Sequence, residues 1–307
     1  MANRAVNSRL GVRVKETDVE NSLPPISELL AQQDRKVYHY ENLSGERVNV
    51  DLEPLVHRDL MRLPLPIDRE GYCLENKTPR YWFTGLADWL NVQEAVQRFG
   101  SGSRERLRVL DFGCASGRFL RHVWQDRREW IADIWGCDYS PQNVDWCQRY
   151  LEPEIKVILN HEVPHLPFAD GYFDLITAFS VFTHIDQLAD AWLLELRRIT
   201  RPGGLLYITF ANQATWNKVL GRAQEFKWLQ KANKFSVNSI VVDEQLFASP
   251  MPAERIAWQM NDDPVYNKNV WFTDEYVHRH WGRFLNVREI VDCGHLSYQS
   301  VAILQVP

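Results

Sequence analysis

Apolar residues in the middle of the chain form two alternating patterns: short continuous runs, and longer stretches with apolar positions three or four residues apart. The continuous runs are rich in aliphatic and β-branched side chains and predict buried strands. The stretches between them predict amphipathic helices, the first two starting near Arg118 and Pro141. This alternation predicts an α/β fold with a mostly parallel sheet. The five predicted strands are 108–112, 134–138, 155–160, 173–180 and 205–210.

The flanking regions have weaker patterns. Apolar positions at helical spacing end at Gly100 and predict one or two helices over 81–99, whereas the proline-containing stretch before them predicts an extended, lid-like segment. The stretch after the fifth strand is longer than a simple crossover needs. We therefore divide the chain into a flexible N-terminal arm (1–34), the lid-like segment (35–80), a core (81–210), an insertion (211–271) and the end of the core sheet (272–307).

The first predicted strand ends in an acid, Asp111, and runs into a turn of small residues. Gly113, Ala115 and Gly117 leave the backbone of this turn unshielded, so that a ligand can lie against it. A nicotinamide-binding turn requires a third small residue where this chain has Arg118, and steric bulk therefore argues against that class.

The second predicted strand ends at Asp138 and is followed by Ser140-Pro141, a helix-start signal. A carboxylate at the carboxyl end of a parallel strand can accept hydrogen bonds from both hydroxyls of a ribose. The alternative role for Asp138 is that of a simple helix cap.

The pattern Asp-x-Gly-x-Ala-x-Gly resembles the first motif of the class I S-adenosylmethionine-dependent methyltransferases, with Ala115 in place of the middle glycine. The added methyl group is tolerable if Ala115 keeps a negative φ. The Leu-Pro-Phe-Ala-Asp-Gly-Tyr-Phe-Asp segment at 166–174 and the Arg-Pro-Gly-Gly turn at 201–204 resemble the same family. The resemblance implies a three-layer Rossmann-like α/β sheet, mostly parallel with an antiparallel final strand, plus a helical insertion.

The resemblance implies S-adenosylmethionine as the methyl donor and S-adenosylhomocysteine as the product. It places Asp111 at the amino-acid end of the cofactor, Asp138 at the ribose, and either Glu162 or Asn160 at the adenine amino group. It also implies that 81–210 binds the cofactor and 211–271 the substrate. The residues that we expect to bind the cofactor are Asp111, Gly113, Ala115, Gly117, Asp138, Tyr139, Asn160, Glu162 and Ser180.

Methyl transfer mainly requires in-line alignment of donor and nucleophile, but a hydroxyl acceptor must also lose its proton. Histidine is the usual general base, and His184, after the fourth strand, is the best-placed of nine histidines. Its alternative role is structural, and other histidines remain candidates. These are His161, His165 and His295.

Aromatic side chains of the insertion have two possible roles: to stack on a sugar or planar acceptor, or to fill a small core. Its basic residues either steer a phosphate-bearing substrate or form a solvated helix face. The aromatic residues are Trp216, Trp228, Trp258 and Trp271, and the basic ones Lys218, Arg222, Lys227, Lys231 and Lys234.

A net charge of −5 argues against nonspecific nucleic-acid binding. No apolar run reaches the length of a membrane span, and the first ten residues lack the apolar core of a signal peptide, so we expect a cytoplasmic protein. The five cysteines form no Cys-x-x-Cys pair, and we expect neither structural zinc nor another metal.

The family resemblance, with which these observations agree, implies a methyltransferase acting on a small molecule or saccharide, and we expect the acceptor to be a hydroxyl. An N-methyltransferase acting on a small amine is one alternative, and it needs no general base. A second alternative, from another class, is a cofactor-binding regulatory or scaffold subunit without catalysis. An intact cofactor site beside a blocked acceptor pocket would favour that subunit. The oligomeric state is not predicted.

Overall fold

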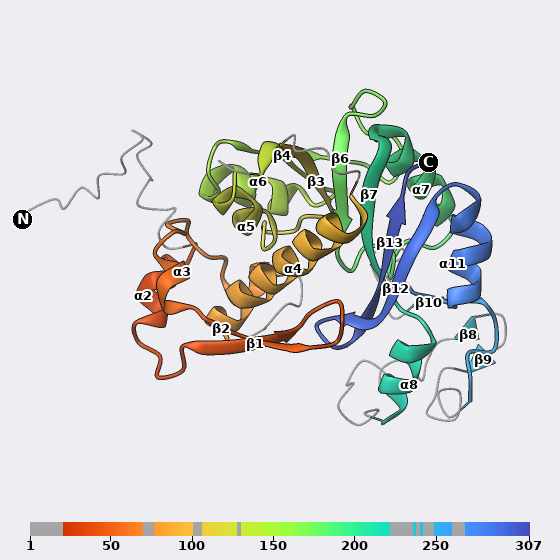
Figure 1. Ribbon diagram of the computed structural model, residues 1–307, viewed down its shortest axis with the longest axis horizontal. Coiled ribbons are helices and arrows are strands. Elements are labelled where there is room, and N and C mark those ends of the chain that lie inside the picture. The colour runs from red at the N-terminus through yellow and green to blue at the C-terminus, as the bar shows by residue number, and fades with distance from the viewer. Residues whose placement is uncertain are drawn as a thin grey trace, which may run out of the picture.

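A seven-stranded sheet forms the centre of the computed structural model, with the strand order β12-β13-β7-β6-β3-β4-β5 (Figure 1). Five neighbouring strands are parallel, and β13 (Gln299–Gln305) is antiparallel to both β7 and β12 (Asn286–His295). This topology confirms the predicted α/β fold. The parallel strands are β7 (Thr200–Phe210), β6 (Phe173–Ala178), β3 (Leu107–Phe112), β4 (Ile131–Asp138) and β5 (Ile155–Leu159). The structure describes residues 21–69, 77–100, 106–127, 130–221, 236–237, 240–241, 249–259 and 268–307.

Helices cover both faces of the sheet, which explains why the strands are apolar on both sides. One face packs against α4 (Thr78–Phe99), α5 (Leu120–Gln125) and α6 (Pro141–Tyr150), where Val109 and Leu175 contribute strand side chains. The other face packs against α7 (Ala189–Ile199) and α11 (Asp274–His280), where Leu110 and Ile176 contribute. The alternation along β3 and β6 thus builds two separate cores.

The starts of α6 and α11 follow local capping signals. The hydroxyl of Ser140 accepts a hydrogen bond from Asn143 N, and that of Thr273 accepts one from Tyr276 N. Asp186, an acid shortly after the fourth strand, is also a capping residue type and predicts a helix start there. This prediction is wrong, because α7 begins at Ala189 and has no side-chain cap. The carboxylate of Asp186 instead pairs with Arg255 of β10 (Arg255–Gln259).

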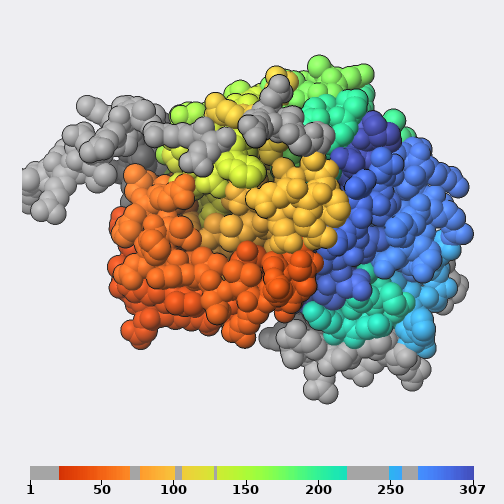
Figure 2. Space-filling model, viewed as in Figure 1, coloured from red at the N-terminus to blue at the C-terminus, as the bar shows by residue number. Residues whose placement is uncertain are grey.

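The lid-like segment contains an antiparallel hairpin of β1 (Val37–Glu41) and β2 (Arg47–Asp51), which lies along α4 beside the C-terminal strands (Figure 2). The ring centroid of Tyr38 in β1 lies 5.2 Å from that of Phe83 in α4. A third apolar core joins this part of the chain to the first half of α4, with Ile26 and Trp82 among its members. Short helices flank the hairpin: α2 (Ile26–Leu30), α3 (Glu53–Val56) and η1 (Pro66–Asp68).

The insertion contributes the predicted helix, α8 (Gln213–Gly221), and two small hairpins. Trp216 and Trp271 are fully buried and meet edge to face with ring centroids 5.2 Å apart, which confirms the core role for these two residues. The side chain of Trp258, and all of Trp228, Arg222, Lys227, Lys231 and Lys234, lie outside the described residues. The hairpins are β8 (Ser236–Val237) with β9 (Ile240–Val241), and β10 with β11 (Lys268–Phe272).

Each helix in the described part of the chain is too short or too polar to cross a membrane.

Buried aromatic rings complete the core on the α7 and α11 face of the sheet. There the 3-10 helix η2 (Trp281–Arg283) places Trp281 against Phe182 and Phe210. Packed side chains therefore cover both faces of the sheet. The carboxyl ends of the parallel strands are the place where a ligand can bind.

Candidate active site

The turn after β3 is fixed to the end of β4 by backbone hydrogen bonds. Gly113 N and Cys114 N both donate to Cys137 O, at 2.9 and 3.0 Å. Ala115 N donates to Asp138 Oδ2 at 2.8 Å. Because parallel strands end at the same sheet edge, the two acid-ended strands meet at this turn, as the sequence predicts.

Asp138 is 4% exposed, and its carboxylate connects the turn to the start of α6. In addition to the bond from Ala115, Asp138 Oδ1 accepts hydrogen bonds from Ser140 N at 2.9 Å and Asn143 Nδ2 at 3.2 Å. The carboxylate therefore orients both the turn and the helix. Ribose binding by Asp138 stays a prediction.

Three residues of the turn have left-handed backbone conformations. Gly113 and Gly117 have φ of 78° and 73°, which glycine adopts without strain, but Ala115 has φ of 45°. The condition under which the extra methyl group of Ala115 is tolerable without strain, a negative φ, is therefore not met. An L-residue in this conformation costs about 1–2 kcal/mol, and the hydrogen bond from Ala115 N to Asp138 helps to hold it there.

Both glycines of the turn also permit close packing. A Cβ atom at Gly113 would overlap Val181 Cγ2, and one at Gly117 would overlap Leu151 Cδ1. The missing Cβ atoms therefore let the loop after β6 and the end of α6 approach the turn. This packing is a structural reason for glycine at both positions, in addition to the predicted ligand contact.

Asp111 lies beneath the turn and is 3% exposed. Burial raises the pKa of its carboxyl to about 7, although a hydrogen bond from Thr177 Oγ1 at 2.8 Å acts in the opposite direction. Asp111 lines a small cavity of about 20 Å³ together with Gly113, Ala115 and Arg118. A buried carboxylate beside an unshielded backbone can accept hydrogen bonds from an ammonium group. Asp111 and the turn therefore fit the amino-acid end of the predicted cofactor. The space admits about one water molecule, and its lining does not include Asp138 or Asn160, so the predicted ribose and adenine contacts lie outside this cavity.

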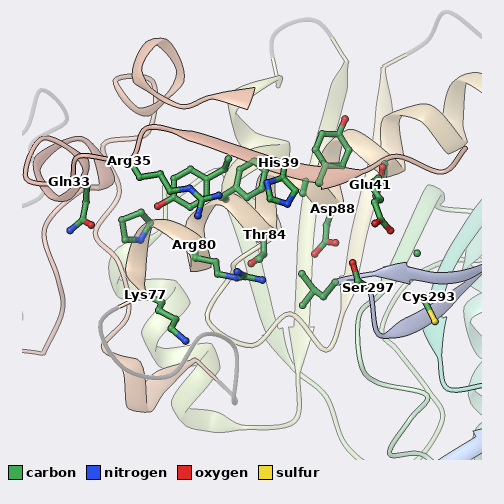
Figure 3. Close-up of a pocket in the computed structure, with 18 residues that line it drawn as sticks. Gln33, Arg35, His39, Glu41, Lys77, Arg80, Thr84, Asp88, Cys293 and Ser297 are labelled. Carbon is green, nitrogen blue, oxygen red and sulfur yellow. The ribbon is translucent and has the colours of Figure 1, made fainter. Parts of the chain in front are cut away.

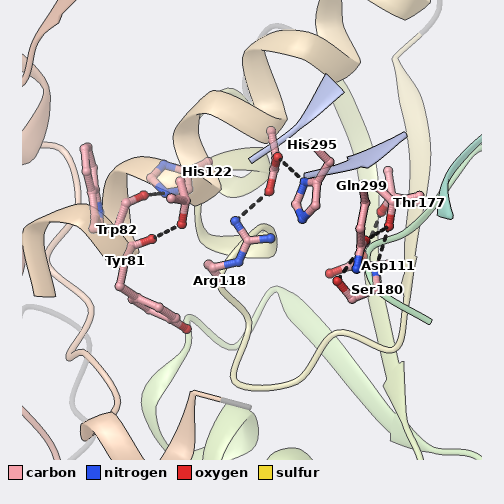
Figure 4. Close-up of polar contacts among 12 residues, drawn as sticks. Tyr81, Trp82, Asp111, Arg118, His122, Thr177, Ser180, His295 and Gln299 are labelled. Carbon is pink, nitrogen blue, oxygen red and sulfur yellow. Dashed lines mark hydrogen bonds and ion pairs between the residues drawn. The ribbon is translucent and has the colours of Figure 1, made fainter. Parts of the chain in front are cut away.

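A buried charged network lies beside this cavity (Figure 4). Arg118 Nη1 lies 2.6 Å from Asp88 Oδ2, and His295 Nδ1 lies 2.9 Å from Asp88 Oδ1. Burial acts to raise the pKa of Asp88, but the charges of His295 and Arg118 outweigh it and hold that pKa below its ordinary value. Asp88 therefore stays ionised although it is only 4% exposed.

Ser180 follows β6 with φ of 58° and is held by neighbouring strands. Its N–H donates to Thr209 Oγ1 at 2.7 Å, and its hydroxyl donates to Gln299 Oε1 at 3.0 Å. Thr209 Oγ1 donates to the same oxygen of Gln299 at 2.8 Å. The carboxyl edges of β6 and β7 and the start of β13 are thereby connected at the loop that carries Val181.

The other predicted site residues differ in their placement. Asn160 N donates to Asp138 O at 3.0 Å, so Asn160 lies beside the acid-ended strand, and Tyr139 is 39% exposed next to Asp138. Glu162 is exposed. His184 is also exposed, and its N–H donates to Val181 O at 2.9 Å. The structure thus gathers the turn, Asp111, Asp138 and Asn160, and places Glu162 and His184 at the surface.

A larger cavity of about 390 Å³ lies between the β1–β2 hairpin, α4 and the turn joining β12 to β13 (Figure 3). Asp88 lines this cavity and pairs with Arg118, which lines the small one. The ion pair therefore forms part of the partition between the two cavities. Among the described residues of 211–271, none belongs to either lining.

Sequence analysis missed the polar residues of α4 that face the larger cavity. Thr84, Asp88 and Asn91 are all buried and all line it. Their spacing of four and then three residues places them on one helix face, within a stretch otherwise rich in aromatic and aliphatic residues. Polar residues on an apolar helix face are the signal that points to this site.

Residues 110–208 match the family model described as a methyltransferase domain. A malonyl-[acyl-carrier protein] O-methyltransferase from Pectobacterium atrosepticum is 29% identical over 141 residues, which cover 44% of this chain and 51% of that protein. A demethylmenaquinone methyltransferase from Beutenbergia cavernae is 31% identical over 115 residues, covering 38% and 45%. The chain thus spans about half the length of these two relatives.

Among solved structures, the chain is similar to a magnesium protoporphyrin IX methyltransferase from Synechocystis PCC 6803 with bound SAH. The TM-score is 0.48 at 13% identity, and the match covers 78% of this chain and 91% of that one.

Proposed function

We propose that the chain is a class I S-adenosylmethionine-dependent methyltransferase that methylates a hydroxyl group of a small molecule or saccharide, because residues 110–208 match a family model described as a methyltransferase domain. The observation that carries the proposal is the meeting of two acid-ended parallel strands at one bare turn, with Ala115 N donating to Asp138. A carboxyl edge of this kind is where open α/β sheets bind ligands.

The proposed cofactor contacts follow from the donors and acceptors at this edge. Asp111 would pair with an ammonium group, Asp138 would accept hydrogen bonds from ribose hydroxyls, and Asn160 beside it would meet the adenine, with Glu162 as the exposed competitor. When bound, the cofactor supplies an activated methyl group on its sulfonium. The predicted set also includes Gly113, Ala115, Gly117, Tyr139 and Ser180.

The proposed general base is His184. It belongs to the loop that packs over the turn, because its N–H donates to Val181 O and the side chain of Val181 covers Gly113. In this role an imidazole nitrogen of His184 takes the proton of the acceptor hydroxyl. The name of the Pectobacterium relative, an O-methyltransferase, supports an oxygen acceptor.

The proposed binding site for the body of the acceptor is the larger cavity. Because the lining of this cavity does not include His184, a base role for His184 requires that the reacting hydroxyl extend beyond it to the loop after β6. The cavity volume of about 390 Å³ lies within the range of small-molecule sites, and Asp88 connects the cavity to Arg118 at the turn. An open cavity at this position supports an enzyme over a regulatory or scaffold subunit, for which a blocked acceptor pocket is expected. The insertion 211–271 remains the proposed second contributor to specificity.

Binding and turnover test this proposal separately. S-adenosylhomocysteine at 100 times its dissociation constant should stabilise the protein by about 2.7 kcal/mol in a thermal unfolding assay, and a nicotinamide dinucleotide should not. Methyl transfer from labelled S-adenosylmethionine to a panel of phenols, sugars and amines then identifies the acceptor atom by mass spectrometry. Absence of cofactor binding overturns the proposal. Products methylated only on amines favour the N-methyltransferase, and cofactor binding without any transfer favours the scaffold subunit.

A further inference from the structure

The larger cavity has a pronounced charge asymmetry. Arg35, Lys77 and Arg80 lie toward one end, and Asp88, Glu41 and Ser297 lie toward the other (Figure 3). In the part of the chain that the structure describes, none of the three cationic side chains forms an ion pair, whereas Asp88 is paired with Arg118. The cationic end therefore carries positive charge that the described side chains do not neutralise.

An aromatic wall extends from the cationic end along the cavity. The rings of Tyr38 and Phe83 have centroids 5.2 Å apart, and Tyr40 is 6.5 Å from Phe83. Arg35 Cζ lies 4.9 Å from the centre of the Tyr38 ring. Burial raises the pKa of Tyr38, while Arg35 and Arg80 act to lower it, so both guanidinium groups lie near this side chain. The guanidinium group of Arg35 thus lies over an aromatic ring, and Arg80 lines the same cavity.

We propose that this cavity binds a small molecule in which a ring carries a phosphate group, with the phosphate among Arg35, Lys77 and Arg80 and the ring along Tyr38 and Phe83. A phosphate monoester carries nearly two negative charges and three acceptor oxygens, which suits two planar guanidinium groups and an ammonium group. The volume of about 390 Å³ accommodates a ring with one such substituent.

The opposite end of the cavity determines how the ligand lies. Asp88, Asn91 and Ser297 offer oxygen and amide groups there, which suits ring hydroxyls and repels a second phosphate. Asp88 is also the residue in contact with Arg118 at the methyltransferase turn. The phosphate is thereby kept away from the turn and the hydroxyl-bearing edge is directed toward it. Only the identification of this ligand as the methyl acceptor rests on the proposed function.

Calorimetry on the full chain tests the proposal with phenyl phosphate as the probe, at constant ionic strength. Phenol and inorganic phosphate each carry half of the recognised chemistry and should bind more weakly than phenyl phosphate. Arg35→Gln and Arg80→Gln should each weaken phenyl phosphate binding about tenfold, a modest loss because both residues are exposed to solvent. Arg149→Gln is the matched control, because Arg149 is an exposed arginine on α6, paired with Asp145 and outside the lining.

Three outcomes overturn the inference: no binding of phenyl phosphate, binding of phenol with equal affinity, or unchanged affinity in both arginine variants. Binding of S-adenosylhomocysteine to the same samples separates this inference from the proposed function. If phenyl phosphate binds as expected and S-adenosylhomocysteine does not, the phosphate site stands and the methyltransferase proposal fails. The reverse result removes the phosphate site alone.

Discussion

The two cavities on either side of the Arg118–Asp88 pair are built in different ways. The small cavity of about 20 Å³ takes most of its lining from one local motif, Asp111 to Phe119, packed so closely that two glycines are required. The large cavity of about 390 Å³ draws its lining from three separate parts of the chain. A local motif can specify a turn and its hydrogen bonds, whereas a site assembled from distant segments can change its specificity without disturbing that turn.

Charge distinguishes the two sites as clearly as size does. Beside the small cavity, Asp111 is buried and its pKa is raised to about 7, a state that a bound cation would relieve. The large cavity instead has three cations at one end. The comparison therefore predicts that the small site selects a cationic ligand part and the large site an anionic one.

The largest expected effect is that of replacing His184, and it tests whether a catalytic group lies outside the two cavities. His184 lines neither of them. If it is the general base for a hydroxyl acceptor, His184→Ala should lower kcat by about a hundredfold to ten-thousandfold, with partial recovery at alkaline pH. His57→Ala, at an exposed histidine that is not a candidate base, is the control. Wild-type turnover by His184→Ala on an identified hydroxyl acceptor would remove His184 from the mechanism.

A smaller effect is expected at the ribose acceptor. Asp138→Ala removes the acceptor for two charge-assisted hydrogen bonds, so S-adenosylmethionine should bind about tenfold to several hundredfold more weakly by calorimetry. The melting temperature should also fall, because Asp138 holds Ala115 N and Ser140 N. Asp145→Ala, an exposed acid on α6, controls for the change in net charge. Unchanged affinity in a folded Asp138→Ala protein would disprove the ribose assignment.

The raised pKa of Asp111 makes its contribution to the free energy of unfolding depend on pH, which distinguishes that contribution from its role in cofactor binding. Its pKa is about 7 when folded, above the ordinary value of 3.8, so the folded state binds the proton more tightly. The resulting stability is fully present below about pH 4 and is lost as the pH rises to about 7. Asp111→Asn should remove this dependence and be at least as stable as the wild type at pH 8 by urea unfolding, yet bind S-adenosylmethionine more weakly. A variant that loses stability at pH 8 and keeps its affinity would show that Asp111 only braces the turn.

The smallest effect concerns packing at the turn. Gly117→Ala places a Cβ atom against Leu151 at a positive φ and should lower the free energy of unfolding by about 1–3 kcal/mol. Gly45→Ala is the matched control, because Gly45 also has a positive φ but has open space around it. Gly45→Ala should therefore show the backbone cost alone. Equal losses in the two variants would mean that Leu151 moves aside freely.

Local patterns in the sequence determined the sheet, its helices and the turn. Continuous apolar runs require burial on both faces, and Ser140 and Thr273 cap helices through bonds to residues three positions away. The meeting of Asp111 and Asp138 at one edge followed from the parallel order of the strands. Asp186 shows the limit of such signals, because its pairing with Arg255 overrode the capping pattern.

Only the tertiary structure decided which distant residues share a cavity. Asp88 and His295 are 207 positions apart, and no local periodicity connects the β1–β2 hairpin with the turn before β13. The positive φ of Ala115 likewise depends on a carboxylate from the neighbouring strand. Side chains from separate segments meet because both must bury their apolar neighbours against α4 and the sheet. That packing is a property of the whole fold, whereas a strand, a cap or a glycine turn is specified by adjacent residues.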